Sequence, residues 1–228
     1  MLKFSNFNIL FKLILKKIRL IVLKNQREEN LSKVLIDIII KNKKSNNVKI
    51  LDYGSGFEPR VAHLIKTGLI KNKIKSRINC LDLYKKRDLD MLNRNSSIEF
   101  KNISYLNKKK RKYDFCIVAD TLHHIGVEND IQITKILIKL KSQSRIIIIK
   151  DHFEYNYFSR QILRFMDFIG NYYNNVSIPK KYFRQKEFDR FLKRSNFKIL
   201  SKVVNVKYYS NFFIFFSNPR LHFIYIIR

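Results

Sequence analysis

The 228-residue sequence has no tryptophan, two cysteines, two alanines, five glycines and three prolines. Neither Cys80 nor Cys116 has metal-ligand spacing or lies in a Cys-x-x-Cys motif, so cysteine-based zinc and redox sites are disfavoured. Both lie in apolar runs, and we expect them to be reduced core residues of a cytoplasmic protein. No Ser/Gly/Pro-rich linker and no internal repeat divides the chain, which predicts a single globular domain.

Acidic residues are also scarce. The chain has 18 Asp and Glu against 47 Lys and Arg, and a formal net charge of +29 at pH 7. Such a charge can attract nucleic acid or an anionic membrane. However, a composition that favours Lys, Ile and Asn over Ala is also typical of an A+T-rich genome, which places lysine on surfaces without a polyanionic partner. We therefore interpret the charge mainly as a solvated basic surface.

The N-terminal apolar segment is too interrupted to span a bilayer. Lys12, Lys16, Lys17 and Arg19 divide its Leu, Ile and Phe residues, so no run of about 20 apolar residues exists there. Ser5, Asn8, Lys12, Lys16 and Arg19 would share one stripe of a helix, with Leu, Ile and Phe filling most of the rest. We expect residues 1–47 to form a helical segment that packs on the following domain, and contact with a membrane surface is the alternative.

From residue 48 onward, continuous apolar runs alternate with helical periodicity. This pattern is typical of the doubly wound α/β class, a mostly parallel sheet with helices on both faces. The last two strands should be antiparallel, because a short turn near Asn218 and Pro219 joins them. The predicted strands are 48–52, 77–83, 97–102, 113–120, 145–151, 197–209 and 221–227, and the predicted helices are 30–43, 58–70, 128–140 and 185–195.

Two of the five glycines, Gly54 and Gly56, follow the first strand and precede the helix that Pro59 opens. Ligands of open α/β sheets bind beyond the carboxyl ends of the strands, and glycine lets a ligand approach the backbone closely. The dinucleotide spacing G-x-G-x-x-G fails, because position 59 is proline. Asp52 before the turn suits a ligand that carries a positive amine better than a pyrophosphate.

This stretch resembles the acid-x-Gly-x-Gly motif of the class I S-adenosylmethionine-dependent methyltransferases, although Glu58 stands where the family usually has a further glycine. A second match is Asp82 at the end of strand two, where family members have an acid that binds both ribose hydroxyls. The third match is residues 113–126, in which an aromatic-Asp pair begins strand four and Leu-His-His follows it. Asn102 is the weaker candidate for the adenine-recognising position.

The resemblance implies a seven-stranded sheet whose last strand is antiparallel, with residues 48–228 as the methyltransferase domain and S-adenosylmethionine as the cofactor. It implies in-line transfer of a methyl group to a small acceptor. The aromatic-rich residues 153–183 are expected to form a lid-like insertion over the acceptor pocket, and their composition favours an apolar or aromatic acceptor. The expected cofactor-binding residues are Asp52, Gly54, Gly56, Asp82, Asn102 and Asp120.

A general base is needed only if the acceptor loses a proton, and histidine suits that task near neutral pH. The catalytic candidates are His124, His123, His152 and Asp151, at the ends of strands four and five. We favour His124 or His152 as the base and expect at least one of the paired histidines to cap a loop or to pack. We predict no metal site. The alternative is a divalent cation shared by Asp120 and Asp151, as in metal-dependent catechol-type methyltransferases.

Two other functions stay open. Asp120 and Lys150 resemble the strand-end pair of 2′-O RNA methyltransferases, which would use the basic surface. The main basic clusters, 41–44, 71–77 and 108–112, precede strands and so belong at the edge opposite the cofactor, where RNA phosphates are not expected. The missing glycine and the absent adenine acid also leave an inactive cofactor-binding protein as an alternative.

Overall fold

The computed structural model describes residues 26–56, 59–94, 96–107, 113–171, 177–208 and 218–228. The helix predicted within residues 1–25, and position 58, lie outside them. The described residues form a seven-stranded sheet in the order β3-β2-β1-β4-β5-β7-β6, in which β7 is antiparallel to both of its neighbours. The predicted fold class is therefore confirmed. The strands are β1 (Asn47–Tyr53), β2 (Lys75–Asp82), β3 (Glu99–Asn102), β4 (Tyr113–Ala119), β5 (Ser144–His152), β6 (Ile199–Val204) and β7 (His222–Ile227).

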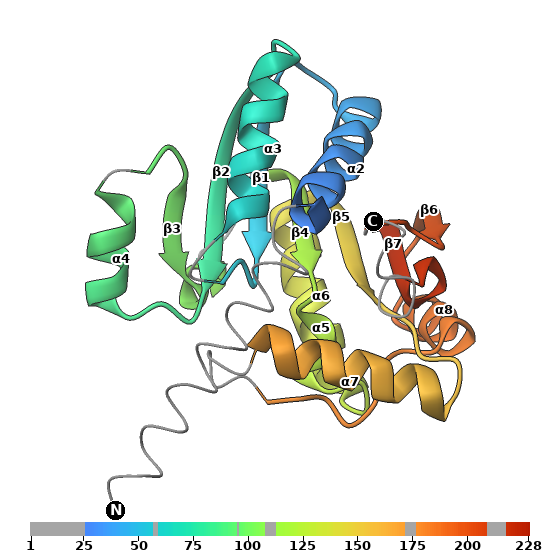
Figure 1. Ribbon diagram of the computed structural model, residues 1–228. Coiled ribbons are helices and arrows are strands. Elements are labelled where there is room, and N and C mark those ends of the chain that lie inside the picture. The colour runs from blue at the N-terminus through green and yellow to red at the C-terminus, as the bar shows by residue number, and fades with distance from the viewer. Residues whose placement is uncertain (1–25, 57–58, 95, 108–112, 172–176, 209–217) are drawn as a thin grey trace, which may run out of the picture.

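Helices cover both faces of the sheet (Figure 1). On one face α2 and α3 pack against each other and against the sheet, and on the other α6 and α8 do so. None of the described helices combines the length and the apolarity needed to cross a membrane. The helices are α2 (Gln26–Asn42), α3 (Arg60–Lys71), α4 (Lys86–Asn93), α5 (Leu122–Ile125), α6 (Asp130–Gln143), α7 (Tyr157–Asn171) and α8 (Gln185–Arg194), with 3-10 turns at η1 (Ile103–Asn107) and η4 (Pro219–Leu221).

The four consecutive isoleucines of β5 explain how one strand fills two cores. Side chains of a strand alternate between the faces of the sheet. Ile146 and Ile148 pack with α2 and α3, whereas Ile147 and Ile149 pack with α6 and α8. A continuous apolar run is therefore required in a strand that is covered on both sides.

The parallel strands end at a common edge of the sheet. In Figure 1 the arrows of β1 and β4 point toward the side on which α7 lies. The glycine turn follows β1, the histidine pair follows β4, and Asp151 and His152 end β5. Residues that are far apart in the sequence are thus collected along one edge.

The apolar stripe of α7 is not its buried face. Phe158, Ile162, Phe165 and Ile169 recur at helical spacing, as in a helix that packs into a core, yet Phe158 and Phe165 are 61% and 49% exposed. Ser159, Leu163 and Asp167 are buried instead. On this inward face Asp167 forms polar contacts, which are described below. The spacing of apolar residues cannot predict contacts of this kind.

Candidate active site

The glycine turn after β1 depends on backbone torsions that other residues rarely adopt. Gly54 has φ of +75° and Gly56 has φ of +69°, and the Gly54 N–H donates to the Leu81 carbonyl at 2.8 Å. A Cβ on Gly54 would lie 2.4 Å from Oγ1 of Thr121, whereas a Cβ on Gly56 would meet no atom within 4 Å. Gly54 therefore allows the β1 and β4 loops to approach, and Gly56 borders open space.

Asp82 is brought directly to this turn. One carboxylate oxygen accepts from the Gly56 N–H at 2.7 Å and the other accepts from the Leu83 N–H at 2.7 Å. Each carboxylate oxygen has two lone pairs, so both can accept a further hydrogen bond. The carboxylate can thus hold the turn and still bind two hydroxyl groups.

Asp52 is a buried acid at the end of β1. Burial, followed by the negative charge of Asp82, raises the pKa of Asp52 to about 7. Its side chain is therefore partly protonated at neutral pH. A cation bound beside it would favour the charged form.

Tyr84, which the sequence did not single out, connects the turn to Asn102. The Tyr84 hydroxyl contacts Oγ of Ser55 at 2.8 Å and also donates to the Gly56 carbonyl. The Asn102 side chain donates to the Tyr84 carbonyl at 2.7 Å and accepts from the Ser104 N–H at 2.9 Å. Asn102 thus positions the Tyr84 loop, and its contact with an adenine stays a prediction.

Asp120, which follows β4, is the centre of a charge cluster in which Lys150 and His152 are buried and Asp120 and Arg27 are half-buried. Its carboxylate forms ion pairs with Arg27 of α2 and Lys150 of β5, and lies 3.0 Å from Nε2 of His152. Burial alone would raise the pKa of Asp120, but the positive charges of Lys150 and Arg27, together with the hydrogen bond from His152, outweigh it and hold this pKa well below its usual range. Asp120 is therefore ionised and already neutralised by protein groups, and its predicted contact with a cofactor stays a prediction.

His123 is fully buried between two carboxylates. Its Nδ1 lies 2.5 Å from Oδ1 of Asp151, and its Nε2 lies 3.4 Å from Oδ2 of Asp167. The Tyr182 hydroxyl donates to the same Asp167 oxygen. Burial alone would lower the pKa of His123. The carboxylates of Asp151 and Asp167 outweigh this effect, and the resulting pKa is about 10. In this form His123 carries a proton at pH 7 and does not act as a base.

The other two candidate histidines are neutral at pH 7. Burial lowers the pKa of His124, whose Nδ1 lies 3.2 Å from the Ser177 carbonyl. Burial, followed by the charge of Lys150, also lowers the pKa of His152. Nδ1 of His152 has no hydrogen-bond partner among the described residues. The structure therefore separates the predicted candidates into one cationic and two neutral histidines.

No protein-family model and no curated protein matches this sequence. Solved structures do match. The CurJ carbon methyltransferase has a TM-score of 0.56 at 13% identity, over 88% of this chain and 53% of that one. The 1,6-didemethyltoxoflavin N1-methyltransferase of Burkholderia thailandensis has a TM-score of 0.56 at 12% identity, over 90% and 79% of the two chains. The magnesium protoporphyrin IX methyltransferase of Synechocystis PCC 6803 has a TM-score of 0.53 at 11% identity, over 88% and 83%.

The chain has the class I methyltransferase fold. At these identities the fold is what the proteins share, and this chain spans about half the length of the CurJ chain. The methyltransferase fold accounts for the grouping of the Gly54 turn and Asp82 along one edge, because parallel strands present their carboxyl ends together.

Several residues at this edge of the methyltransferase fold could not be found from the sequence. Arg27 meets Asp120 across 93 positions of the chain, and Asp167 reaches His123 from a separate helix. No motif or local spacing links such partners. Tyr84 gave a weak signal, since it lies two positions after Asp82.

Proposed function

We propose that the protein transfers a methyl group from S-adenosylmethionine to a small acceptor. The observation that carries this proposal is the Gly54–Gly56 turn, held by the Asp82 carboxylate beside the buried Asp52 at the strand ends. Two of the solved neighbours, the magnesium protoporphyrin IX methyltransferase and the 1,6-didemethyltoxoflavin N1-methyltransferase, have bound S-adenosylhomocysteine. This supports the choice of cofactor.

The residues of the turn fit the cofactor chemically. The free lone pairs of Asp82 suit the two ribose hydroxyls, and the charged form of Asp52 suits the amino group. The open space beside Gly56 lets a ligand approach the backbone. The bound cofactor supplies an electrophilic methyl group, and the protein's task is to hold the acceptor in line with it.

We propose a small, apolar or aromatic acceptor. Several solved neighbours are named for small-molecule acceptors, among them mitomycin and 1,6-didemethyltoxoflavin. The segment 153–183 is rich in Phe and Tyr, and its helix α7 lies along the edge of the sheet that carries Asp82 and His123 (Figure 1). Lid motion of this segment stays a prediction.

We propose His152 as the base wherever the acceptor must lose a proton. Asp120 binds its Nε2 at 3.0 Å, which favours the tautomer that carries a lone pair on Nδ1. His152 is neutral at pH 7, as a base must be. Its ring and Nδ1 are buried, so an acceptor reaches Nδ1 only after the surrounding side chains move. Asp120 then acts as a positioning residue that orients the ring.

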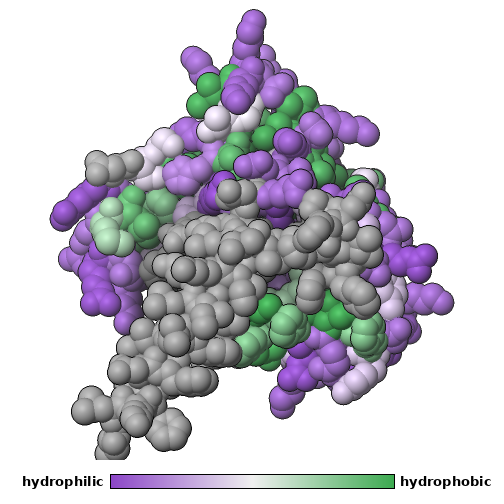
Figure 2. Space-filling model, in the orientation of Figure 1, coloured by the Kyte–Doolittle hydropathy of each residue, from purple (hydrophilic) through white to green (hydrophobic). Residues whose placement is uncertain are grey.

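RNA is the less favoured acceptor. Lys150 exposes no surface, and its ammonium group is paired with Asp120, so it is poorly placed to meet a ribose. Hydrophilic and apolar residues alternate around the visible described surface (Figure 2).

Calorimetric titration with S-adenosylhomocysteine tests the cofactor site. The wild type should bind in the micromolar range, and Asp82→Ala should weaken binding roughly 10- to 100-fold, because hydrogen bonds to a charged group are lost. The matched control is Asp90→Ala, an exposed acid of α4, which should bind as the wild type does. Absence of binding by folded wild-type protein would overturn the proposal, whereas binding without transfer to any acceptor would favour an inactive cofactor-binding protein.

Cofactor affinity should also depend on pH through Asp52. Below its pKa of about 7 the free protein holds a proton there, and the ammonium group of the ligand must displace it. The affinity for S-adenosylhomocysteine should therefore fall up to about tenfold between pH 8 and pH 6. Asp52→Asn should bind more weakly with a flat profile, and a sloping profile in this variant would assign the effect to another group.

A further inference from the structure

We propose that His123 and His124 of α5 and Asp167 of α7 form a binding site for a divalent transition-metal ion. One ring nitrogen of each histidine and one carboxylate oxygen lie within 4.8 Å of one another. Two imidazoles and a carboxylate are a ligand set typical of Zn²⁺, Fe²⁺ and related ions, and they suit Mg²⁺ poorly. Three protein ligands leave further coordination positions for water or for an oxygen atom of a small molecule.

The distance between His123 and Asp167 fits such an ion. Nε2 of His123 and Oδ2 of Asp167 are 3.4 Å apart, which is long for a hydrogen bond. Two ligand atoms of a tetrahedral zinc ion with bonds of about 2.0–2.1 Å are separated by roughly 3.3 Å. This pair therefore already has the spacing of one edge of a zinc tetrahedron.

His123 is also oriented as metal-binding histidines are. Its Nδ1 is held by the Asp151 carboxylate at 2.5 Å, which directs Nε2 toward Asp167. Nε2 is buried and has no hydrogen-bond partner among the described residues. A carboxylate behind the ligating histidine fixes the ring and increases its basicity in many metal sites. With a metal bound, the ion takes the place of the proton between the two side chains.

The other two ligands have supporting contacts as well. The Tyr182 hydroxyl donates to the Asp167 carboxylate. Nδ1 of His124 lies 3.2 Å from the Ser177 carbonyl, so Nε2 is the nitrogen suited to an ion. The His124 ring is half-buried and contacts the His123 ring at an angle of 45°, with ring centroids 4.1 Å apart. The small movement needed to complete the site therefore falls on the least enclosed ligand.

A second group of possible ligands consists of Asp120, Asp151 and His152. Their ligand atoms also lie within 4.8 Å of one another, but the surrounding charge is less suitable for a cation. Asp120 is already paired with the cationic side chains of Lys150 and Arg27. These charges oppose a further cation. The metal predicted as an alternative at Asp120 and Asp151 is therefore less favoured than one at His123, His124 and Asp167.

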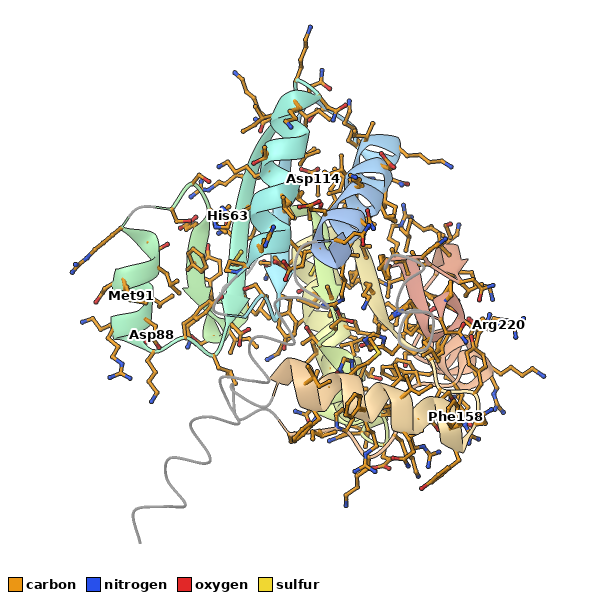
Figure 3. The ribbon with its side chains drawn as sticks, viewed as in Figure 1. His63, Asp88, Met91, Asp114, Phe158 and Arg220 are labelled. Atoms are coloured by element: carbon orange, nitrogen blue, oxygen red, sulfur yellow. The ribbon has the colours of Figure 1, made fainter. Side chains whose placement is uncertain are left out.

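Metal binding can be measured without any methyl acceptor. Tag-free, chelator-treated protein should bind one Zn²⁺ ion in calorimetry with micromolar or stronger affinity, and Co²⁺ should give the visible absorption of a protein-bound ion. Asp167→Asn and His124→Gln should each weaken Zn²⁺ binding about tenfold or more. The control is His63→Gln, because His63 is exposed on α3, well away from α7 (Figure 3), and should not contribute.

Three results would overturn the proposal. The first is folded wild-type protein that binds no Zn²⁺. The second is binding by both Asp167→Asn and His124→Gln that equals that of the wild type. The third is loss of binding in Asp120→Asn with retention in His124→Gln, which would place the ion in the second group. Circular dichroism of each metal-free variant checks its folding, and the half-buried His124 makes its variant the decisive one if Asp167→Asn is unfolded.

Discussion

Gly54→Ala should lower the free energy of unfolding by about 3 kcal/mol and abolish measurable binding of S-adenosylhomocysteine. An alanine with φ of +75° costs about 1–2 kcal/mol. Its Cβ would also lie 2.4, 2.5 and 3.0 Å from Oγ1, Cγ2 and Cβ of Thr121. These contacts are too short for real atoms, so the turn must move away from the β4 loop.

Gly56→Ala is the matched control. It has a similar positive φ but no atom within 4 Å of the new Cβ, so its unfolding free energy should fall by only about 1 kcal/mol. Denaturant unfolding of both variants separates torsional cost from steric overlap. The double variant with Thr121→Ala should recover part of the loss at Gly54. Equal losses at the two glycines would contradict the steric explanation.

Asp120→Asn should lower the free energy of unfolding by about 3 kcal/mol at pH 7. The change keeps the shape of the side chain but leaves the fully buried Lys150 ammonium without its counter-charge, and breaking a buried ion pair costs about 3–5 kcal/mol. Asp120 has φ of +51°, which asparagine tolerates well. Backbone strain is therefore unchanged, and the experiment measures the charge.

The same effect has a defined pH dependence. The pKa of Asp120 is depressed, so its stabilisation is complete above the ordinary value of 3.8 and is lost as the pH falls through the depressed value. The difference between wild type and Asp120→Asn should therefore be constant near neutrality and shrink below about pH 4. Asp37→Asn, on the exposed face of α2, should change stability by less than about 0.5 kcal/mol. A difference below 1 kcal/mol between Asp120→Asn and wild type at pH 7 would show that the cluster relaxes or admits water.

The sheet was predictable because its strands are buried on both faces. Such strands are continuous apolar runs, as in Ile146–Ile149, and they stand out from helical periodicity. The turn before β7 likewise indicated that this strand is antiparallel. Its antiparallel pairing with β5 and with β6 confirms this prediction. By contrast, α4 is short and buries no side chain, so apolar spacing gave no sign of it.

The grouping at the site was only partly predictable. Gly54, Asp82 and the histidine pair lie at strand ends, and strand ends can be located from the sequence. What each group contacts depends on other segments. The face of α7 that carries Asp167, and the reach of Arg27 to Asp120, arise from packing between distant elements. The local pattern of apolar and polar residues therefore cannot predict these partners.

The position of β7 also affects how the protein is made. β7 lies between β5 and β6, although it follows both of them in the chain. While the nascent chain extends only as far as β6, the edge of β5 is unpaired, and it carries Ile147, Ile148 and Ile149. Open apolar edges readily pair with other chains. Until residues 222–227 emerge and insert, synthesis passes through an aggregation-sensitive stage, in which protection by a chaperone would have its largest effect on yield.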